Sequence, residues 1–190
     1  MAAEQAVTLI QVGDLTIRRM RDDPHDYRLM AMWLSDERVL EFYEGRDQPH
    51  PYGRVVHKYR PRVRGDDPVR PSILVYQEVE TGYLQYYLVT SPADCGLADA
   101  TDTHGIDMFI GEPEYWDRGI GSRALSALAR YLFDELNARK IVIDPHVDNL
   151  RAVRAYEKAG FRKVKILAKH ELHEGAYRDS WLMTLEPEVL

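Results

Sequence analysis

Several features that mark common protein classes are missing from this sequence. It has one cysteine among 190 residues, so no disulfide can form within the chain, and we expect a reducing, cytoplasmic environment. No apolar run is long enough to cross a bilayer, and the N-terminus has no basic start followed by an apolar segment. Long polar tracts are absent as well, which argues against wholesale disorder. We therefore expect a globular protein that does not enter a membrane.

An excess of positive charge is also missing. The 31 acidic residues outnumber the 25 Lys and Arg residues, which gives a net charge of −6. Such a chain should repel nucleic acid and anionic membrane surfaces, and it should attract polycations. The hydrophobic share of 45% suits one domain with a sizeable core. We place this domain at residues 1–190, with residues 1–12 as an N-terminal extension, and we expect a monomer.

The first half of the chain predicts short elements. Strands are expected at residues 15–20, 72–77, 83–89 and 106–110, with Thr81-Gly82 as a hairpin turn. A helix is expected at residues 27–34, and Ser35 is placed to cap a second helix that carries Phe42 and Tyr43. Residues 45–71 form a polar, proline-containing stretch.

The second half alternates between helix and strand patterns. Residues 119–138 predict a long amphipathic helix, with Leu125, Leu128, Leu132 and Leu136 on one face. A buried strand at 141–143, a helix at 149–159 and late strands at 164–167 and 180–185 follow. This alternation predicts an α/β (α+β) fold with a mixed sheet.

The segment Trp116–Ser122, called here the glycine loop, lies between a strand and the long helix. It contains Arg118-Gly119-Ile120-Gly121-Ser122, and its glycines let backbone amides approach a ligand closely. These amides are the unpaired donors of a helix N-terminus, where the helix dipole adds positive charge. Together they suit a pyrophosphate, with Arg118 as a further contact. The alternative is an ordinary turn, because this pattern is neither a P-loop nor a dinucleotide fingerprint.

The helix at 149–159 has Asn149 as its cap and Gly160 as its end. Asn149 and Tyr156 are two helical turns apart, so both side chains can face one groove, together with Ala152. The alternative is a capped helix whose tyrosine belongs to the core.

The glycine loop, its helix, a strand and the segment Asn149–Phe161 together resemble the GNAT acetyltransferase superfamily. The resemblance implies a mostly antiparallel central sheet flanked by helices, with acetyl-CoA as cofactor. It implies that the glycine loop holds the pyrophosphate and that Tyr156 protonates the departing thiolate. The residues to which it assigns cofactor contacts are Phe109, Ile110, Trp116, Arg118, Gly119, Ile120, Gly121, Ser122, Asn149, Ala152 and Tyr156. Trp116 departs from the Gln or Arg that is frequent in the family.

Longer segments resemble the acetyltransferase half of the bifunctional aminoglycoside acetyltransferase–phosphotransferases. They are Trp33–Tyr43, Phe109–Pro113, Tyr115-Trp116, Asp144-Pro145-His146 and His170–Gly175. The resemblance implies acetyl transfer to the 6′-amine of an aminoglycoside such as kanamycin, and hence antibiotic resistance. It also implies that Asp107 and Asp144 lie in the substrate cleft, with Asp107 as a catalytic residue.

Charge considerations support an acidic site independently. An aminoglycoside is a polycation, and carboxylates are the groups expected to line its site. Asp107 lies within an apolar strand segment and Asp144 ends another, which is costly unless each carboxylate serves a partner or is hydrated. The alternative for each is a strand-end residue that caps a turn.

Other substrate contacts are less strongly specified. Glu174 and Asp179 are candidates for binding substrate amines, although solvated surface charge is the alternative. Phe42 and Tyr43 are candidates for an aromatic wall against sugar rings, with core packing as the alternative. His170 and His173 lack the glutamate and spacing of a zinc helix, so we expect loop residues and no metal.

Two rival functions remain. The first is acetylation of another small polyamine or amine metabolite, which the cofactor half of the pattern does not exclude. The second is a non-catalytic module that senses acyl-CoA or a drug, which the combination of Asn149, Tyr156 and the glycine loop disfavours.

Overall fold

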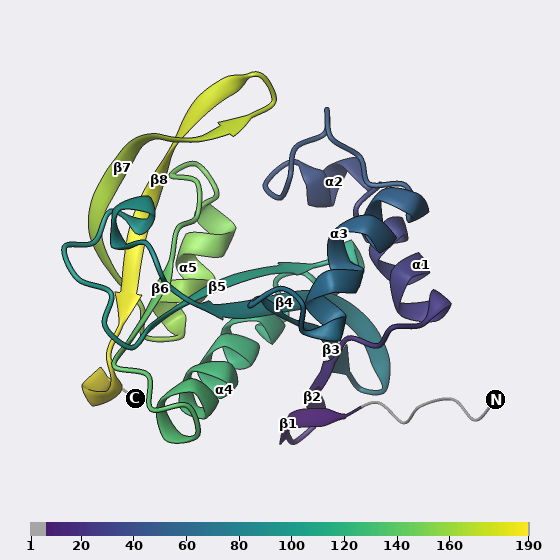
Figure 1. The fold of residues 1–190 in the computed structure, drawn as a ribbon, viewed down its shortest axis with the longest axis horizontal. Helices are drawn as coiled ribbons and strands as arrows, with labels where there is room; N and C mark the ends of the chain where they lie inside the picture. The colour runs from purple at the N-terminus through teal and green to yellow at the C-terminus, as the bar shows by residue number, and fades with distance from the viewer. Residues whose placement is uncertain (1–6, 190) are drawn as a thin grey trace. The chain divides into compact units, whose positions relative to one another are not determined.

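The computed structural model of the chain describes residues 7–189 (Figure 1), and these residues form a mixed sheet flanked by helices. The strand order is β1-β2-β3-β4-β5-β6-β8-β7. β5 and β6 are parallel, whereas the pairs β1–β2, β2–β3, β6–β8 and β7–β8 are antiparallel. The predicted fold class, with a mostly antiparallel sheet, is confirmed.

The chain divides into two compact units. The first unit comprises the residues up to Gln85 and Met108–Trp116, and the second comprises Tyr86–Asp107 and the residues from Asp117 onward. Strands β4 (Val79–Leu88) and β5 (Thr103–Ile110) each contribute residues to both units. Each unit is described by itself below.

The first unit combines three antiparallel strands with three helices. Its strands are β1 (Thr8–Val12), β2 (Leu15–Arg19) and β3 (Arg70–Tyr76), and its helices are α1 (Pro24–Trp33), α2 (Glu37–Leu40) and α3 (Tyr52–Arg64). The helices pack around buried aromatic residues that include Tyr27, Trp33, Tyr59, Tyr83 and Phe109. Part of the expected N-terminal extension, residues 8–12, therefore pairs with β2 as a strand, and residues 1–6 lie outside the described part.

In this unit the structure differs from the sequence analysis at three points. The cap of α2 is Asp36, whose carboxylate accepts a hydrogen bond from the Arg38 amide, and not Ser35. Residues 45–71 contain α3, which buries Val55 and Tyr59 on one face. The third correction concerns a turn and is described next.

The hairpin between β3 and β4 turns at Gln77 and Glu78, and not at Thr81-Gly82. Gln77 and Glu78 both have left-handed backbones, with φ of 49° and 67°. Gly82 lies inside β4, where a Cβ atom would be 2.5 Å from the Phe109 carbonyl oxygen. The glycine is thus required by a close approach of two strands rather than by a turn.

The second unit contains two helices and three further strands, namely α4 (Ile120–Asp134), α5 (Leu150–Lys158), β6 (Lys140–Ile143), β7 (Arg162–His173) and β8 (Ala176–Leu185). Leu125, Leu128 and Leu132 on α4 are fully buried, as the helical pattern predicts. The helix ends earlier than expected, because Asn137 takes a left-handed φ of 54°, and Leu136 is 38% exposed.

The hairpin of β7 and β8 is longer than the late strands predicted from the sequence (Figure 1). It turns at Glu174 and Gly175, which both have positive φ. His170 and His173 therefore lie in β7, which corrects their expected place in a loop. β7 is at the edge of the sheet and is mostly exposed, so it lacks the apolar alternation by which a strand is recognised.

Short 3₁₀ turns complete the described residues, at Pro92–Cys95, Pro113–Tyr115 and Pro187–Val189. Across residues 7–189, no helix combines the length and the apolar character that a membrane crossing requires.

Candidate active site

The N-terminus of α4 in the second unit leaves its backbone amides open. Gly119 occupies the cap position with a left-handed φ of 74°, and no side chain there hydrogen-bonds to the first-turn amides. Ser122 donates from its hydroxyl to the Gly119 carbonyl at 3.0 Å, so this side chain closes the turn without covering the amides. The geometry suits an anionic group at the helix N-terminus.

A lysine that the sequence analysis missed lies beside this turn. The Nζ atom of Lys158, on α5, is 3.9 Å from the position that a Cβ atom on Gly119 would occupy. Apart from the residues next to Gly119 in the chain, the Ser122 hydroxyl is the only other neighbour among residues 7–189 within 4 Å of that position. An ammonium group and open helix amides at one place make a site for phosphate oxygens.

Helix α5 begins and ends as its sequence predicts. The Asn149 side-chain oxygen accepts a hydrogen bond from the Ala152 amide at 3.2 Å, which confirms the cap. At the other end, Gly160 has a φ of 100°, and the Phe161 amide donates to the Tyr156 carbonyl at 3.0 Å. The helix is thus fixed at both ends, and Tyr156 is held in the interior with 7% of its surface exposed.

The negative charges of two carboxylates in the same unit act on the Tyr156 hydroxyl. Burial raises the pKa of its hydroxyl well above the ordinary value, and the negative charges of Asp107 and Asp144 raise this pKa further. The phenol therefore keeps its proton at neutral pH and is a hydrogen-bond donor there.

The two carboxylates are half-buried at different strands. Asp107 lies in β5, and Asp144 follows the last residue of β6. Asp144 accepts a hydrogen bond from the His170 ring at 2.8 Å. This contact and the negative charge of Asp144 raise the pKa of His170 despite the opposing effect of burial. The charges of Asp107 and Asp144, on two separate elements, thus both act on the Tyr156 hydroxyl of α5.

Three aromatic candidates in the first unit, Tyr43, Phe109 and Trp116, lie in its core or pack against it. Tyr43 packs against Phe109 with ring centroids 4.7 Å apart, and Phe109 is 8% exposed. The Trp116 indole donates to the Ile110 carbonyl at 2.9 Å, which ties the start of the glycine loop to the end of β5. Phe42 is half-buried. Phe109 itself fits a packing role, so a ligand near it would meet backbone groups.

The loop carboxylates have local partners or are exposed. Asp179 is exposed and accepts a hydrogen bond from the Lys169 amide at 2.8 Å. Glu174 is half-buried at the hairpin turn.

Burial and the charges of Asp144, Asp94 and Asp107 raise the pKa of the Cys95 thiol, so this thiol stays protonated and is a poor nucleophile.

Comparison with known proteins gives a consistent result. Residues 22–169 match the acetyltransferase (GNAT) domain. Aminoglycoside N(6′)-acetyltransferase type 1 of Klebsiella pneumoniae is 31% identical over 151 residues, which cover 78% of this chain and 74% of that protein. A kanamycin resistance protein of Rhizobium radiobacter is 41% identical over 59 residues, which cover 31% of this chain and 55% of that protein.

A solved structure agrees with these matches. The structure of AAC(6′)-Ib in complex with ribostamycin and coenzyme A has a TM-score of 0.74 and 26% identity, covering 93% of this chain and 95% of that one. The family model and the Klebsiella relative each extend over most of the sequence. The chain belongs to the GNAT acetyltransferase family.

Proposed function

We propose that this protein transfers the acetyl group of acetyl-CoA to the 6′-amine of aminoglycoside antibiotics and so confers resistance to them. The observation that carries the proposal is the arrangement in the second unit, where the charges of Asp107 and Asp144 act on the buried hydroxyl of Tyr156. The relatives named for aminoglycoside 6′-acetylation and kanamycin resistance support this choice of acceptor.

The start of α4 provides the phosphate contacts. Its open amides and Lys158 fit the pyrophosphate of acetyl-CoA, because both donate to oxygen without a competing side-chain cap. Arg118 is exposed at the same loop and adds positive charge. Asn149 and Ala152, at the start of α5, contact the pantetheine arm in this proposal.

The carboxylates provide the acceptor contacts. A 6′-amine is protonated in solution, since alkyl amines resemble lysine in pKa. In this proposal Asp107 and Asp144 bind it as an ion pair and orient it, and Asp179 and Glu174 bind further amines of the drug.

The reaction requires three proton movements. Acetyl-CoA supplies the acetyl group as a thioester. Asp107 accepts a proton from the bound ammonium, directly or through water, and the free amine nitrogen then forms its bond to the acetyl carbon. A backbone amide of residues 108–110 donates a hydrogen bond to the acetyl oxygen. As the carbon–sulfur bond breaks, Tyr156 donates its proton to the thiolate. The nitrogen loses its second proton on becoming an amide, and this proton returns through water to the Tyr156 oxygen.

The test is release of thiol from acetyl-CoA by the purified protein after kanamycin is added. We expect rapid release, and mass spectrometry should locate one new acetyl group on the 6′-nitrogen. The matched control is an aminoglycoside with a hydroxyl at the 6′-position, which should release no thiol.

Two outcomes would overturn the proposal in different ways. Release with spermidine but not with kanamycin would retain acetyl transfer and replace the acceptor. Tight binding of acetyl-CoA without thiol release on addition of any amine would favour a sensor of acyl-CoA.

A further inference from the structure

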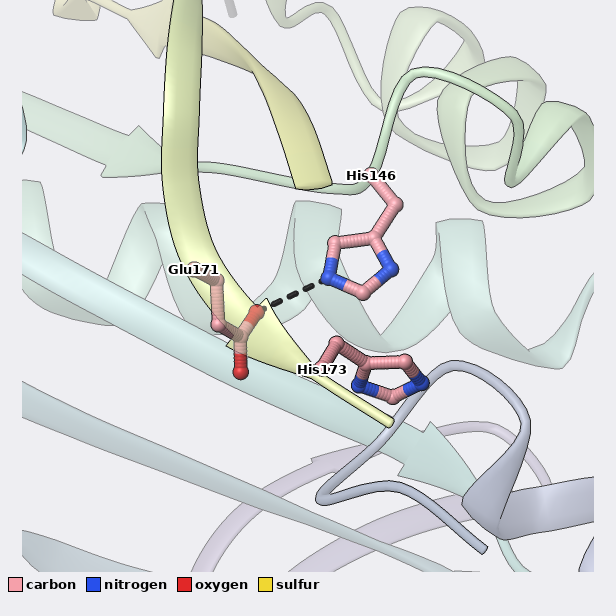
Figure 2. Close-up of side chains that lie close together, drawn as sticks. All are labelled: His146, Glu171 and His173. Atoms are coloured by element: carbon pink, nitrogen blue, oxygen red, sulfur yellow. Dashed lines mark hydrogen bonds and ion pairs between the residues drawn. The ribbon is translucent and has the colours of Figure 1, made fainter. Parts of the chain in front are cut away.

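A cluster of His146, Glu171 and His173 in the second unit has no part in the acetyl transfer described above (Figure 2). His146 follows β6, whereas Glu171 and His173 alternate along β7 and so share one face of that strand. The segment that carries His146 is fixed to β8 by an antiparallel bridge between His146 and Ser180. The three side chains thus come from two segments that both pair with β8.

The geometry of the cluster is compact. The Nε2 atom of His146 is 2.9 Å from Oε2 of Glu171, and the two imidazoles meet edge to face with centroids 4.7 Å apart. One donor atom from each of the three residues lies within 4.8 Å of the others. Tetrahedral zinc ligands are about 3.4 Å apart, given metal–ligand distances of about 2.1 Å. Only small side-chain movements therefore separate this arrangement from a coordination sphere.

Burial distinguishes the cluster from an accidental group of surface residues. His146 is 6% exposed and His173 is 3% exposed, whereas the Glu171 side chain is 52% exposed. The interior half of the cluster therefore consists of two imidazoles, and the carboxylate closes it toward solvent. An ion held there would keep an open side for water, as three-ligand zinc sites do.

A second cluster of possible metal ligands has carboxylates that are already paired with guanidinium groups. His25, Asp26 and Glu80 in the first unit are equally close, but Arg18 donates to Asp26 at 2.7 Å and to Glu80 at 2.6 Å. Arg21 also pairs with Asp26 at 2.7 Å. These guanidinium groups neutralise the carboxylates and would repel a metal ion.

The cluster on β7 has no such guanidinium pair on its carboxylate among the described residues. Arg178 is opposite Glu171 in the strand register, but its guanidinium is 4.0 Å from the Asp148 carboxylate. Glu171 instead accepts a hydrogen bond from His146 at 2.9 Å, and a glutamate carboxylate is ordinarily anionic at neutral pH. A donor set of one carboxylate and two imidazoles binds first-row transition metals in preference to Mg²⁺ or Ca²⁺.

We propose that His146, Glu171 and His173 form a binding site for a first-row transition-metal cation, with zinc as its representative. The ion joins the segment after β6 to the β7–β8 hairpin and so stabilises this part of the second unit. The ion is not required for the acetyl transfer proposed above, and its site can be tested independently of that activity.

The test is calorimetric titration of the whole, tag-free chain with zinc, after treatment with a chelator. We expect one zinc ion per chain, a melting temperature that rises with zinc, and no competition from a large excess of Mg²⁺. Replacement of zinc by Co²⁺ should give a visible absorption spectrum, which reports direct ligation by the protein.

The decisive variants are Glu171→Gln and His173→Gln, compared with His25→Gln as the matched control. Each of the first two should weaken zinc affinity by at least about tenfold, and the control should leave it unchanged. Glu171→Gln tests the proposal even if the buried His173 variant fails to fold, because the Glu171 side chain is half exposed. Equal zinc affinity in the wild type and the Glu171→Gln variant would overturn the proposal, as would equal loss in the His25→Gln control.

Discussion

At the scale of single residues, Tyr156 and the two carboxylates near it have complementary protonation states. Burial and the negative charges of Asp107 and Asp144 disfavour a phenolate and so raise the pKa of Tyr156. The phenol therefore keeps its proton while the carboxylates are ionised. A donor that stays protonated matches the need of a departing thiolate, and a carboxylate matches the need of an ammonium. The two roles therefore follow from one electrostatic arrangement.

Replacing Tyr156 by Phe isolates the donor. The ring contact with Phe161, at 6.3 Å between centroids, involves no hydroxyl, so the fold should persist. We expect kcat to fall by about 10²-fold, whereas the KM for the aminoglycoside should not change. Because the pKa of Tyr156 is raised, its hydroxyl should not cause an alkaline fall of kcat below about pH 10 in the wild type. The measurement is kcat of the wild type and of the Phe variant across pH by steady-state kinetics. A full-speed Phe variant would assign the proton to water or another group.

The change Asp107→Asn tests the base. The amide keeps the size of the side chain but neither accepts a proton nor attracts an ammonium. Turnover should fall by about 10²- to 10⁴-fold, with acetyl-CoA affinity nearly intact when measured by calorimetry. If turnover persists in this variant, Asp107 has no part in proton transfer.

The change Lys158→Gln tests the phosphate contacts. Loss of an exposed charge near Gly119 should raise the KM for acetyl-CoA about fivefold, or ~1 kcal/mol, and leave kcat unchanged. Arg154→Gln is the matched control, because this residue is on the same helix and is exposed. An equal effect of both changes would indicate general electrostatics and not a local contact at the glycine loop.

The residues of the site differ in how readily the sequence reveals them. The local sequence pattern predicts Asn149 as the cap of α5 and Gly119 as the start of α4, and the structure confirms both roles. Lys158 and His146 depend on chain segments that meet only in the fold: Lys158 approaches Gly119 from α5, and His146 meets β7. No local spacing carries such information, so these two were beyond prediction.

At the scale of elements, Gly82 tests the close approach of β4 and β5. A Cβ atom there would be 2.5 Å from the Phe109 carbonyl oxygen and 3.0 Å from the Ile110 Cα atom, and both are backbone atoms that cannot rotate away. Gly82→Ala should lower the free energy of unfolding by about 1–3 kcal/mol, measured by chemical denaturation.

The matched control for that change is Gly53→Ala on α3. Apart from the adjoining backbone of α3, no atom of the described residues lies within 4 Å of a Cβ atom at Gly53, so alanine should add helix propensity without a clash. We expect the free energy of unfolding to stay the same or to rise by about 0.5–1 kcal/mol. Equal destabilisation by both changes would contradict the steric account of Gly82.

Elements with strong local periodicity were predicted well, and those defined by tertiary contacts were not. α4 and α5 have an apolar face or clear end signals, so the sequence places them. α3 buries only Val55 and Tyr59 within a basic, proline-containing segment, and its helical pattern is hidden by that polarity. The β3–β4 turn uses Gln77 and Glu78, so the nearby Thr81-Gly82 was mistaken for it.

At the scale of the whole molecule, the net charge of −6 favours approach of a polycation. Screening sets how much of this attraction survives in salt, because the Debye length falls from about 30 Å at 0.01 M to about 8 Å at 0.15 M. We expect the KM for kanamycin to rise several-fold over this range of a monovalent salt, with kcat constant, because salt acts on binding and not on bond formation.

Acetyl-CoA provides the internal control in the same salt series. It is an anion, so the net charge of the protein repels it while Lys158 and Arg118 attract it locally, and salt weakens both effects. Its KM should therefore change less than that of kanamycin. Parallel changes in the two KM values would point to a general effect of salt on the protein. A kanamycin KM that is independent of salt would mean that only ion pairs at contact distance, such as those assigned to Asp107 and Asp144, hold the drug.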